Sequence, residues 1–311
     1  MTWKTSDIPD LTGRRAVVTG VTGGLGVNSA IELARHGASL VVTARDTKKA
    51  GVALTRIEND APGTIVDVIS LDLADLNDVQ RAANEVTVAY SRVDILINNA
   101  GIMFPPKPSK TVDGYELQMG TNHLGHFALT AHLWPLLVKS KARIVSVSSN
   151  MHKAATGIDL RTFTPEGSPR RYKRTQAYAE SKVANLLFAT ELDRRIKAAG
   201  IDVVSVGAHP GYASTNITKT GPSAGGNSLQ ATGMHQISKV IAQSAAAGSW
   251  PLLMAATDPS LVGGEYVGPG GPGGWRGRPK LAGMSRTARD SNLANALWAA
   301  SESATGVEFS V

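Results

Sequence analysis

A tyrosine and a lysine stand four residues apart in the segment Tyr178-Ala-Glu-Ser-Lys182. If this segment is helical, both side chains project from one face and can interact. A free tyrosine, with a pKa of about 10, is a poor base at neutral pH, but a neighbouring ammonium stabilises the phenolate and lowers that pKa. The pair could therefore exchange a proton with an oxygen that changes between alcohol and carbonyl. Taken alone, the same spacing also fits an ordinary helix surface.

A glycine-rich turn, Thr19-Gly-Val-Thr-Gly-Gly-Leu-Gly26, follows the first apolar segment and opens a predicted helix. Glycines let the backbone turn tightly and approach a pyrophosphate, while the helix N-terminus offers N–H donors. The spacing is T-G-x-x-x-G-x-G rather than G-x-G-x-x-G, and a tight turn without a ligand is the alternative. The turn predicts a dinucleotide site formed by Gly20, Thr22, Gly23, Gly24, Leu25 and Gly26.

The elements that must position these groups follow from the hydrophobic pattern. Short apolar segments alternate with longer amphipathic ones, which is typical of βαβ units and a parallel sheet. Asp46 and Asp75 stand where helix N-caps belong, and Gly37 and Gly200 where helices end. We expect an α/β fold, a doubly wound Rossmann-type domain with a seven-stranded parallel sheet and helices on both faces. The expected strands are 16–19, 40–43, 65–70, 93–97, 143–147, 203–206 and 265–267; the expected helices are 25–36, 47–59, 76–90, 115–138, 177–199, 238–256 and 288–301.

The domain organisation is predicted from length and linkers. A chain of 311 residues could hold two domains, but nothing between the segments reads as a linker. We therefore expect one domain over 1–311, with 12–150 mainly holding the cofactor and 151–311 supplying the catalytic helix, the substrate loop and a C-terminal extension. The stretches 217–228 and 268–279 are rich in glycine and polar or proline residues and are predicted to be loops.

Composition excludes several classes of protein. With 42% hydrophobic and 18% charged residues, the chain is neither disordered nor fibrous. The absence of cysteine excludes disulfides, thiolate zinc sites and cysteine nucleophiles. The N-terminus lacks the apolar core of a secretory signal, and no run of 18 apolar residues suggests a membrane span. We expect a cytoplasmic protein.

The net charge of +7 invites a nucleic-acid interpretation. Basic residues concentrate at 170–174 and 276–289, but aromatic residues are not interleaved with them in a base-stacking pattern. We expect solvated surface charge and no nucleic-acid partner, with contact to polyanions or membrane surfaces as the alternative.

The histidines are the side chains to weigh as metal ligands. His123 and His126 are three residues apart, and His152 and His209 lie near the other candidate residues. A zinc site would need three or four ligands with carboxylate or thiolate support, so no metal is predicted. We expect these histidines to pack or to line a pocket, with His152 and Met151 as candidates to contact substrate.

The turn and the tyrosine pair belong to a series of motifs that resembles the short-chain dehydrogenase/reductase family over roughly residues 12–270. The series continues with Asn98-Asn-Ala-Gly101, Asn122 in TNHLGHF, Ser149 in VSVSSN and Pro210-Gly211 in HPG. The resemblance implies that Asn122, Ser149, Tyr178 and Lys182 are catalytic, with Ser149 preferred to its neighbour Ser148. It further implies that the cofactor contacts Asp72, Leu73, Asn99, Ala100, Gly101, Tyr178, Lys182, Pro210, Gly211, Ala213 and Thr215.

The end of the second predicted strand bears on the choice of cofactor. Proteins of this fold that prefer NAD usually place an acid there for the ribose 2′-hydroxyl. This chain has Ala44 followed by Arg45, with Lys48 and Lys49 one turn on. Asp46 is better explained as an N-cap. Because arginine can bind a 2′-phosphate bidentately, we expect NADP(H). The alternative is that Arg45 is a surface charge and that both cofactors are used.

The segment between Ser149 and Tyr178 is long, polar and basic. With TNHLGHF and YAESKVANLLF, it resembles the retinol-dehydrogenase-like branch of the family. The expected reaction interconverts a carbonyl and an alcohol on a medium-sized apolar molecule. A non-catalytic NADP(H)-binding regulator on the same fold is the alternative, although such a protein would normally have lost the tyrosine or the lysine. The sequence leaves open whether the chain forms homo-oligomers.

Overall fold

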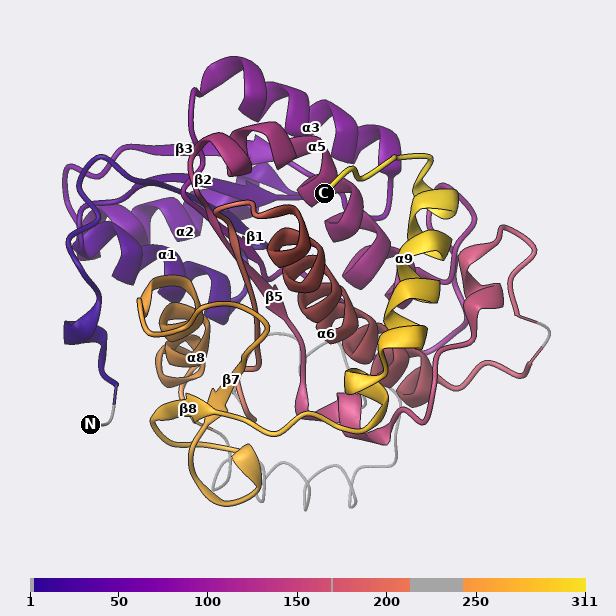
Figure 1. The fold of residues 1–311 in the computed structure, drawn as a ribbon. Coiled ribbons are helices and arrows are strands. Elements are labelled where there is room, and N and C mark those ends of the chain that lie inside the picture. The colour runs from indigo at the N-terminus through magenta and orange to yellow at the C-terminus, as the bar shows by residue number, and fades with distance from the viewer. Residues whose placement is uncertain (1–2, 169, 213–242) are drawn as a thin grey trace, which may run out of the picture.

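The computed structural model describes residues 3–168, 170–212 and 243–311 (Figure 1). The predicted loop 217–228 lies outside the described residues, as do Ala213, Thr215 and the first part of the helix expected at 238–256.

One sheet runs through the molecule with the strand order β3-β2-β1-β4-β5-β6-β7-β8 (Figure 1). All neighbouring strands from β3 to β7 are parallel, as the long connections between them require. The order reverses between β1 and β4, which makes the carboxyl ends of these two strands the expected ligand crevice. The strands are β1 Arg15–Thr19, β2 Ser39–Ala44, β3 Val66–Ser70, β4 Ile95–Asn98, β5 Arg143–Val147, β6 Val204–Ala208, β7 Tyr266–Pro269 and β8 Pro279–Leu281.

The sheet has eight strands among the described residues, one more than the seven expected. Strand β8 lies within and just beyond the stretch predicted to be a loop, and it pairs antiparallel with β7 at the edge of the sheet. Its three residues are too few to produce an alternating pattern, and the pairing depends on the intervening glycine-rich turn.

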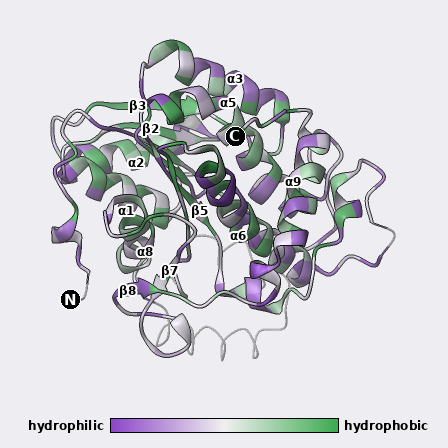
Figure 2. Cartoon of the chain, in the orientation of Figure 1, coloured by the Kyte–Doolittle hydropathy of each residue, from purple (hydrophilic) through white to green (hydrophobic). Residues whose placement is uncertain are grey.

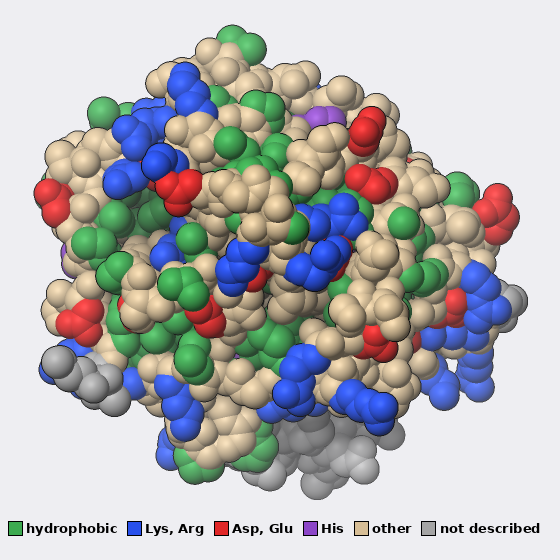
Figure 3. Space-filling view, in the orientation of Figure 1, with side chains coloured by type: hydrophobic (Ala, Val, Ile, Leu, Met, Phe, Trp, Pro, Cys, Tyr) green, Lys and Arg blue, Asp and Glu red, His purple; other side chains and the backbone are tan. Residues whose placement is uncertain are grey.

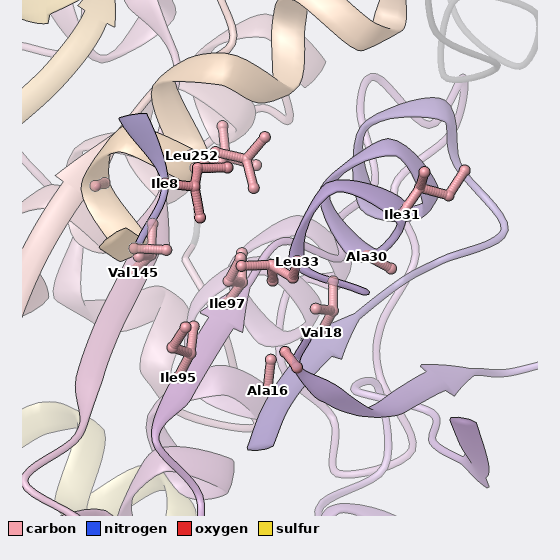
Figure 4. Close-up of a cluster of buried hydrophobic side chains, with 14 of the residues drawn as sticks. Ile8, Ala16, Val18, Ala30, Ile31, Leu33, Ile95, Ile97, Val145 and Leu252 are labelled. Atoms are coloured by element: carbon pink, nitrogen blue, oxygen red, sulfur yellow. The ribbon is translucent and has the colours of Figure 1, made fainter. Parts of the chain in front are cut away.

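Helices cover both faces of the sheet. Hydrophobic residues of α1, α2 and α8 form one cluster with the sheet, and those of α3, α5 and α6 form another, with α9 packed outside α6 (Figure 1). Strand residues alternate between the faces: Val18 and Ile97 enter the first cluster, shown in Figure 4, whereas Val17 and Leu96 enter the second. Figure 2 shows the strands at the centre as mostly hydrophobic. The helices are α1 Gly24–Arg35, α2 Thr47–Asp60, α3 Leu76–Ala89, α4 Leu117–Met119, α5 Gly125–Lys139, α6 Arg174–Ala199, α8 Ala245–Thr257 and α9 Ser291–Thr305.

The predicted helix boundaries are confirmed where side chains cap the ends. Asp46 and Asp75 each accept hydrogen bonds from two backbone N–H groups in the first turn of α2 and α3. Gly200 ends α6 with a φ of 66°, a left-handed conformation that favours glycine. No described helix is both long and apolar enough to span a bilayer.

The helix expected at 115–138 is interrupted. Between α4 and α5 the chain makes a wide π turn over Gly120–Leu124, which contains the predicted site residue Asn122. Such turns are rare and often occur at functional sites. Hydrophobic periodicity does not reveal them, because all five residues of the turn are buried.

Candidate active site

The glycine-rich turn and the N-N-A-G motif meet where the strand order reverses. The Asn99 side-chain amide donates to the carbonyl oxygen of Thr19 at 2.7 Å. The Thr19 hydroxyl oxygen accepts from the backbone N–H groups of Asn99 and Ala100, each at 2.9 Å. These bonds fix the ends of β1 and β4 side by side, so that both loops lie at the same edge of the sheet.

Glycine is required in this turn because of close packing. Gly20 has a φ of 75°, and a Cβ added there would lie 2.8 Å from the Cα of Ala100. A Cβ on Gly26 would lie 2.5 Å from the carbonyl oxygen of Gly20 and 2.8 Å from the Asn99 Nδ2. Helix α1 begins at Gly24, just after Gly23, with no side-chain cap and no acid in its first turn. A helix start of this kind suits an anionic group.

The other residues expected to hold a cofactor border the same edge. Arg45 and Lys48 are exposed at the end of β2 and the start of α2, with Thr22 exposed and Leu25 buried on the glycine turn. Asp72 is half-buried, and its carboxylate accepts from the backbone N–H of Ala74 at 3.0 Å.

The loop after β6 is only partly described. Pro210 accepts a hydrogen bond from the Gln243 side chain at 2.7 Å, and Gly211 has a φ of 67°. Ala213 and Thr215 lie outside the described residues. Leu73 is buried beneath the start of α5, where its backbone approaches Gly125 closely.

Tyr178 and Lys182 lie one turn apart on α6, as the spacing predicted. The Lys182 Nζ atom is 5.7 Å from the centre of the Tyr178 ring. It donates to the carbonyl oxygen of Val147 at 3.1 Å, an oxygen that also accepts from Asn185. A Cβ added to Gly101 would lie 3.5 Å from this ammonium and 2.9 Å from the Asn122 Oδ1. The tyrosine, the lysine and the N-N-A-G loop therefore converge.

The predicted lowering of the tyrosine pKa is wrong for this structure. Burial raises the pKa of Tyr178 to about 12. A hydrogen bond with Ser149 lowers this pKa, but by less than burial raises it. Burial also lowers the pKa of Lys182 to about 8, because a desolvated ammonium is disfavoured. At neutral pH Tyr178 is therefore neutral, which is the state needed to donate a proton.

The two adjacent serines have different surroundings. The Ser148 hydroxyl is buried and donates to the carbonyl oxygen of Lys182 at 2.7 Å, so it fastens β5 to α6. Ser149 follows β5, is partly exposed, and interacts through its side chain with Tyr178. The geometry therefore places Ser149 rather than Ser148 beside the tyrosine.

Asn122 is buried and fixed from three sides. Its Oδ1 accepts from the backbone N–H of Ile102 at 2.8 Å, and its Nδ2 donates to the Ile102 carbonyl oxygen at 3.0 Å. The same Nδ2 donates to the Ser181 hydroxyl at 2.9 Å. Asn122 thus links the loop after β4 to the helix that carries Tyr178.

One buried residue, His126, connects parts of this arrangement, although the sequence did not single it out as a site residue. His126 contacts the Thr19 hydroxyl through Nε2 at 3.0 Å and the carbonyl oxygen of Asn122 through Nδ1 at 3.0 Å. Burial lowers the pKa of His126 to about 4, so the ring is neutral at physiological pH. The only signal for His126 in the sequence is the His-x-x-His spacing, which is more often associated with metal binding.

His152 does not face a substrate, contrary to one expectation. It is fully buried, contacts the carbonyl oxygen of Ser149 through Nδ1 at 2.7 Å, and accepts from the backbone N–H of Ser285 at 3.2 Å. Within the described residues, no three His, Asp or Glu side chains are grouped as metal ligands.

Comparison with known proteins shows the family of the chain. The family model described as short chain dehydrogenase matches residues 14–158. Human retinol dehydrogenase 13 is 35% identical over 95% of this chain and 86% of its own length. Mouse polyprenol dehydrogenase is 34% identical over 96% and 86% of the two chains. The chain belongs to the short-chain dehydrogenase/reductase family, a family of oxidoreductases that bind a nicotinamide cofactor, and within it the chain is retinol-dehydrogenase-like.

A solved structure supports the fold along the whole chain. An uncharacterized protein from Mycobacterium paratuberculosis is 40% identical, with a TM-score of 0.81 and full coverage of both chains. The coverage includes the C-terminal part of this chain, beyond the segment that the family model matches.

Proposed function

We propose that this protein is an NADP(H)-dependent oxidoreductase that interconverts a carbonyl and an alcohol on an apolar molecule. The observation that carries the proposal is the convergence of Tyr178, Ser149, Lys182 and Asn122 beside the glycine-rich turn. A non-catalytic regulator would not need a neutral tyrosine, a serine and a buried lysine in this arrangement.

The described residues fit a dinucleotide. Close packing at Gly20 and Gly26 keeps the turn bare of side chains, and the uncapped start of α1 suits a pyrophosphate. When bound, the nicotinamide would supply or accept a hydride at the substrate carbon.

The protein residues would handle the proton. The Tyr178 hydroxyl donates a proton to the carbonyl oxygen during reduction and accepts it from the alcohol during oxidation. Ser149 holds that oxygen by a hydrogen bond. Lys182 uses one of its three donors on Val147, and its positive charge favours the phenolate that forms when the proton leaves Tyr178. Asn122, fixed by Ile102 and Ser181, would hold a water in the proton relay.

The charge around β2 supports NADP(H) as the cofactor. Arg45 and Lys48 are exposed, whereas the nearby carboxylate of Asp46 is directed to two backbone N–H groups of α2. Lys49 is paired with the same carboxylate at 3.3 Å. Arg45 is therefore the group best suited to a 2′-phosphate. Other basic side chains are scattered over the face shown in Figure 3.

The substrate class rests on the relatives and on the residues beside Tyr178. Retinol and polyprenol, named in the two relatives, are long apolar alcohols. In this chain Phe104, which is partly exposed, packs on Tyr178, and Met151, also partly exposed, lies two residues after Ser149.

The test is turnover of a panel of aldehydes, ketones and alcohols. The reaction is measured by the change in NADPH absorbance and is repeated with NADH. Preferential use of NADPH supports the proposal. NADPH binding without turnover of any substrate would favour the regulator.

Replacing Gly26 with alanine should weaken NADPH binding about 10-fold or more. The added Cβ would press on the Gly20 carbonyl and the Asn99 amide, and overpacking of this kind costs about 1–3 kcal/mol. The measurement is NADPH fluorescence titration. Gly51→Ala is the matched control, since Gly51 lies in α2 with open space around an added Cβ. Equal affinity in wild type and Gly26→Ala would contradict the close-packing argument.

A further inference from the structure

The backbone of Phe104 is unusual. It has a φ of 58°, a left-handed conformation that bulky residues adopt rarely and only when their surroundings enforce it. Phe104 lies in the loop after β4, just beyond the N-N-A-G motif. Lys141, the other described non-glycine residue with positive φ, is exposed in a turn between α5 and β5. Phe104 is instead partly buried and packs against one candidate catalytic residue, Tyr178.

A single buried side chain holds this conformation. The Oε1 atom of Gln118 accepts from the backbone N–H of Phe104 at 2.9 Å. Its Nε2 atom donates to the Tyr172 hydroxyl at 3.2 Å and to the carbonyl oxygen of Arg174 at 3.0 Å. Gln118 is fully buried, and Glu116 accepts from its backbone N–H at 3.1 Å. Both ends of the Gln118 amide are therefore committed.

These bonds join three separate parts of the chain. Phe104 lies in the loop after β4, Gln118 lies in α4, and Tyr172 and Arg174 lie at the junction between the long basic segment and the start of α6. The Tyr172 hydroxyl also donates to the carbonyl oxygen of Pro105 at 3.5 Å. The long segment is thus attached directly to the loop that carries Phe104.

The ring of Phe104 packs edge-to-face on Tyr178, with 5.1 Å between ring centres. A carbonyl oxygen that receives the proton of Tyr178 must lie about 2.7 Å from its hydroxyl oxygen. The substituents of that carbonyl would then approach the tyrosine, whose ring Phe104 already contacts. A bulky substituent on that side would compete with Phe104 for the same space.

We propose that Phe104 is a specificity-determining residue that limits the size of the carbonyl substituent beside Tyr178, and that Gln118 is the positioning residue that holds Phe104 there. The inference rests on the proposed carbonyl reduction and adds a substrate preference to it. It also gives a role to the basic segment before α6, whose Tyr172 shares the Gln118 amide.

The test compares two methyl ketones, one with a straight alkyl chain and one with a bulky branched or aryl group next to the carbonyl. The quantity measured is kcat/KM for the bulky ketone divided by kcat/KM for the straight-chain ketone. Phe104→Ala should raise this ratio about 10-fold, a change typical of a pocket that gains room for a few carbon atoms. Gln118→Met, which has similar volume but no matching hydrogen bonds, should change the ratio in the same direction. The double variant should match Phe104→Ala alone, because Gln118 acts through Phe104.

Tyr172→Phe is the control, because it removes an acceptor of Gln118 and the donor to the Pro105 carbonyl oxygen but leaves the bond from Gln118 to the Phe104 N–H. We expect its ratio to stay within about threefold of wild type, since the hydrogen bond that holds Phe104 is retained and the two lost bonds are between neutral groups. An unchanged ratio in Phe104→Ala, with turnover retained, would overturn the proposal. So would additive effects in the double variant, which would mean that Gln118 acts independently.

A second measurement separates this inference from the proposed function. Amide hydrogen exchange at Phe104 should accelerate at least about 10-fold in Gln118→Met, because the only bond described for this N–H is lost. Exchange can be followed whether or not any ketone is reduced. If wild type reduces no carbonyl, the proposed function fails, and unchanged exchange at Phe104 would then also reject the positioning role of Gln118.

Discussion

Tyr178→Phe should lower kcat/KM for carbonyl reduction by a factor of about 10²–10⁴, the usual contribution of a general acid. The substitution removes one oxygen and leaves the ring that packs on Phe104. NADPH binding should remain measurable by fluorescence, because the glycine turn and Arg45 are untouched. Near-normal turnover in this variant would remove Tyr178 from the mechanism.

A second tyrosine serves as the control for this prediction. The Tyr115 hydroxyl donates to the carbonyl oxygen of Ala304 at 2.6 Å, away from the candidate site. Tyr115→Phe should lower the free energy of unfolding by about 1 kcal/mol through the lost hydrogen bond, with kcat/KM unchanged. Chemical denaturation and steady-state kinetics distinguish the two variants.

The pH dependence of the wild type adds a further check on the same reaction. Lys182 is protonated below its lowered pKa of about 8 and loses its charge above it. Tyr178, with a pKa of about 12, remains protonated through this range. The kcat/KM for reduction should therefore fall as the pH rises through about 8, because the ammonium that stabilises the developing phenolate is lost. A profile that is flat from pH 6 to 10 would contradict the role of Lys182.

Arg45→Glu should lower kcat/KM with NADPH by about 100-fold and reduce the preference over NADH. It would remove the proposed charge-assisted hydrogen bond to the 2′-phosphate and add a like charge; one such bond is worth about 1.5–3 kcal/mol. A carboxylate at this position can instead accept from the 2′-hydroxyl of NADH. Initial rates with both cofactors measure the change.

Lys49→Glu is the control for charge alone. Lys49 is exposed, four residues from Arg45, and its ammonium is paired with Asp46. If both variants weaken NADPH use equally, the effect is long-range attraction rather than recognition of the 2′-phosphate by Arg45. If Arg45→Glu retains the full NADPH preference, the assignment of Arg45 is wrong.

Local patterns were enough to predict the frame of the molecule. Asp46 and Asp75 cap helices because a short acceptor side chain can reach N–H groups two or three residues away. The inner strands are continuous apolar runs because both faces are covered. The edge strand β8 was missed, since three residues carry no pattern and its position depends on pairing with β7.

The sequence by itself determined the candidates for the chemistry. The order of the glycine turn, Asn122, Ser149 and the Tyr178–Lys182 pair follows from the sequence alone, because chain order and spacing are properties of the sequence. Arg45 was likewise identified by its position after an apolar strand.

Only the tertiary structure decided the state and the surroundings of these residues. The neutral state of Tyr178 follows from its burial, which outweighs the favourable interaction with Ser149. The left-handed backbone of Phe104 depends on Gln118, which is 14 residues away and joins a third segment at Tyr172. Desolvation and hydrogen bonding act between groups that folding brings together, so neither can be read from spacing along the chain.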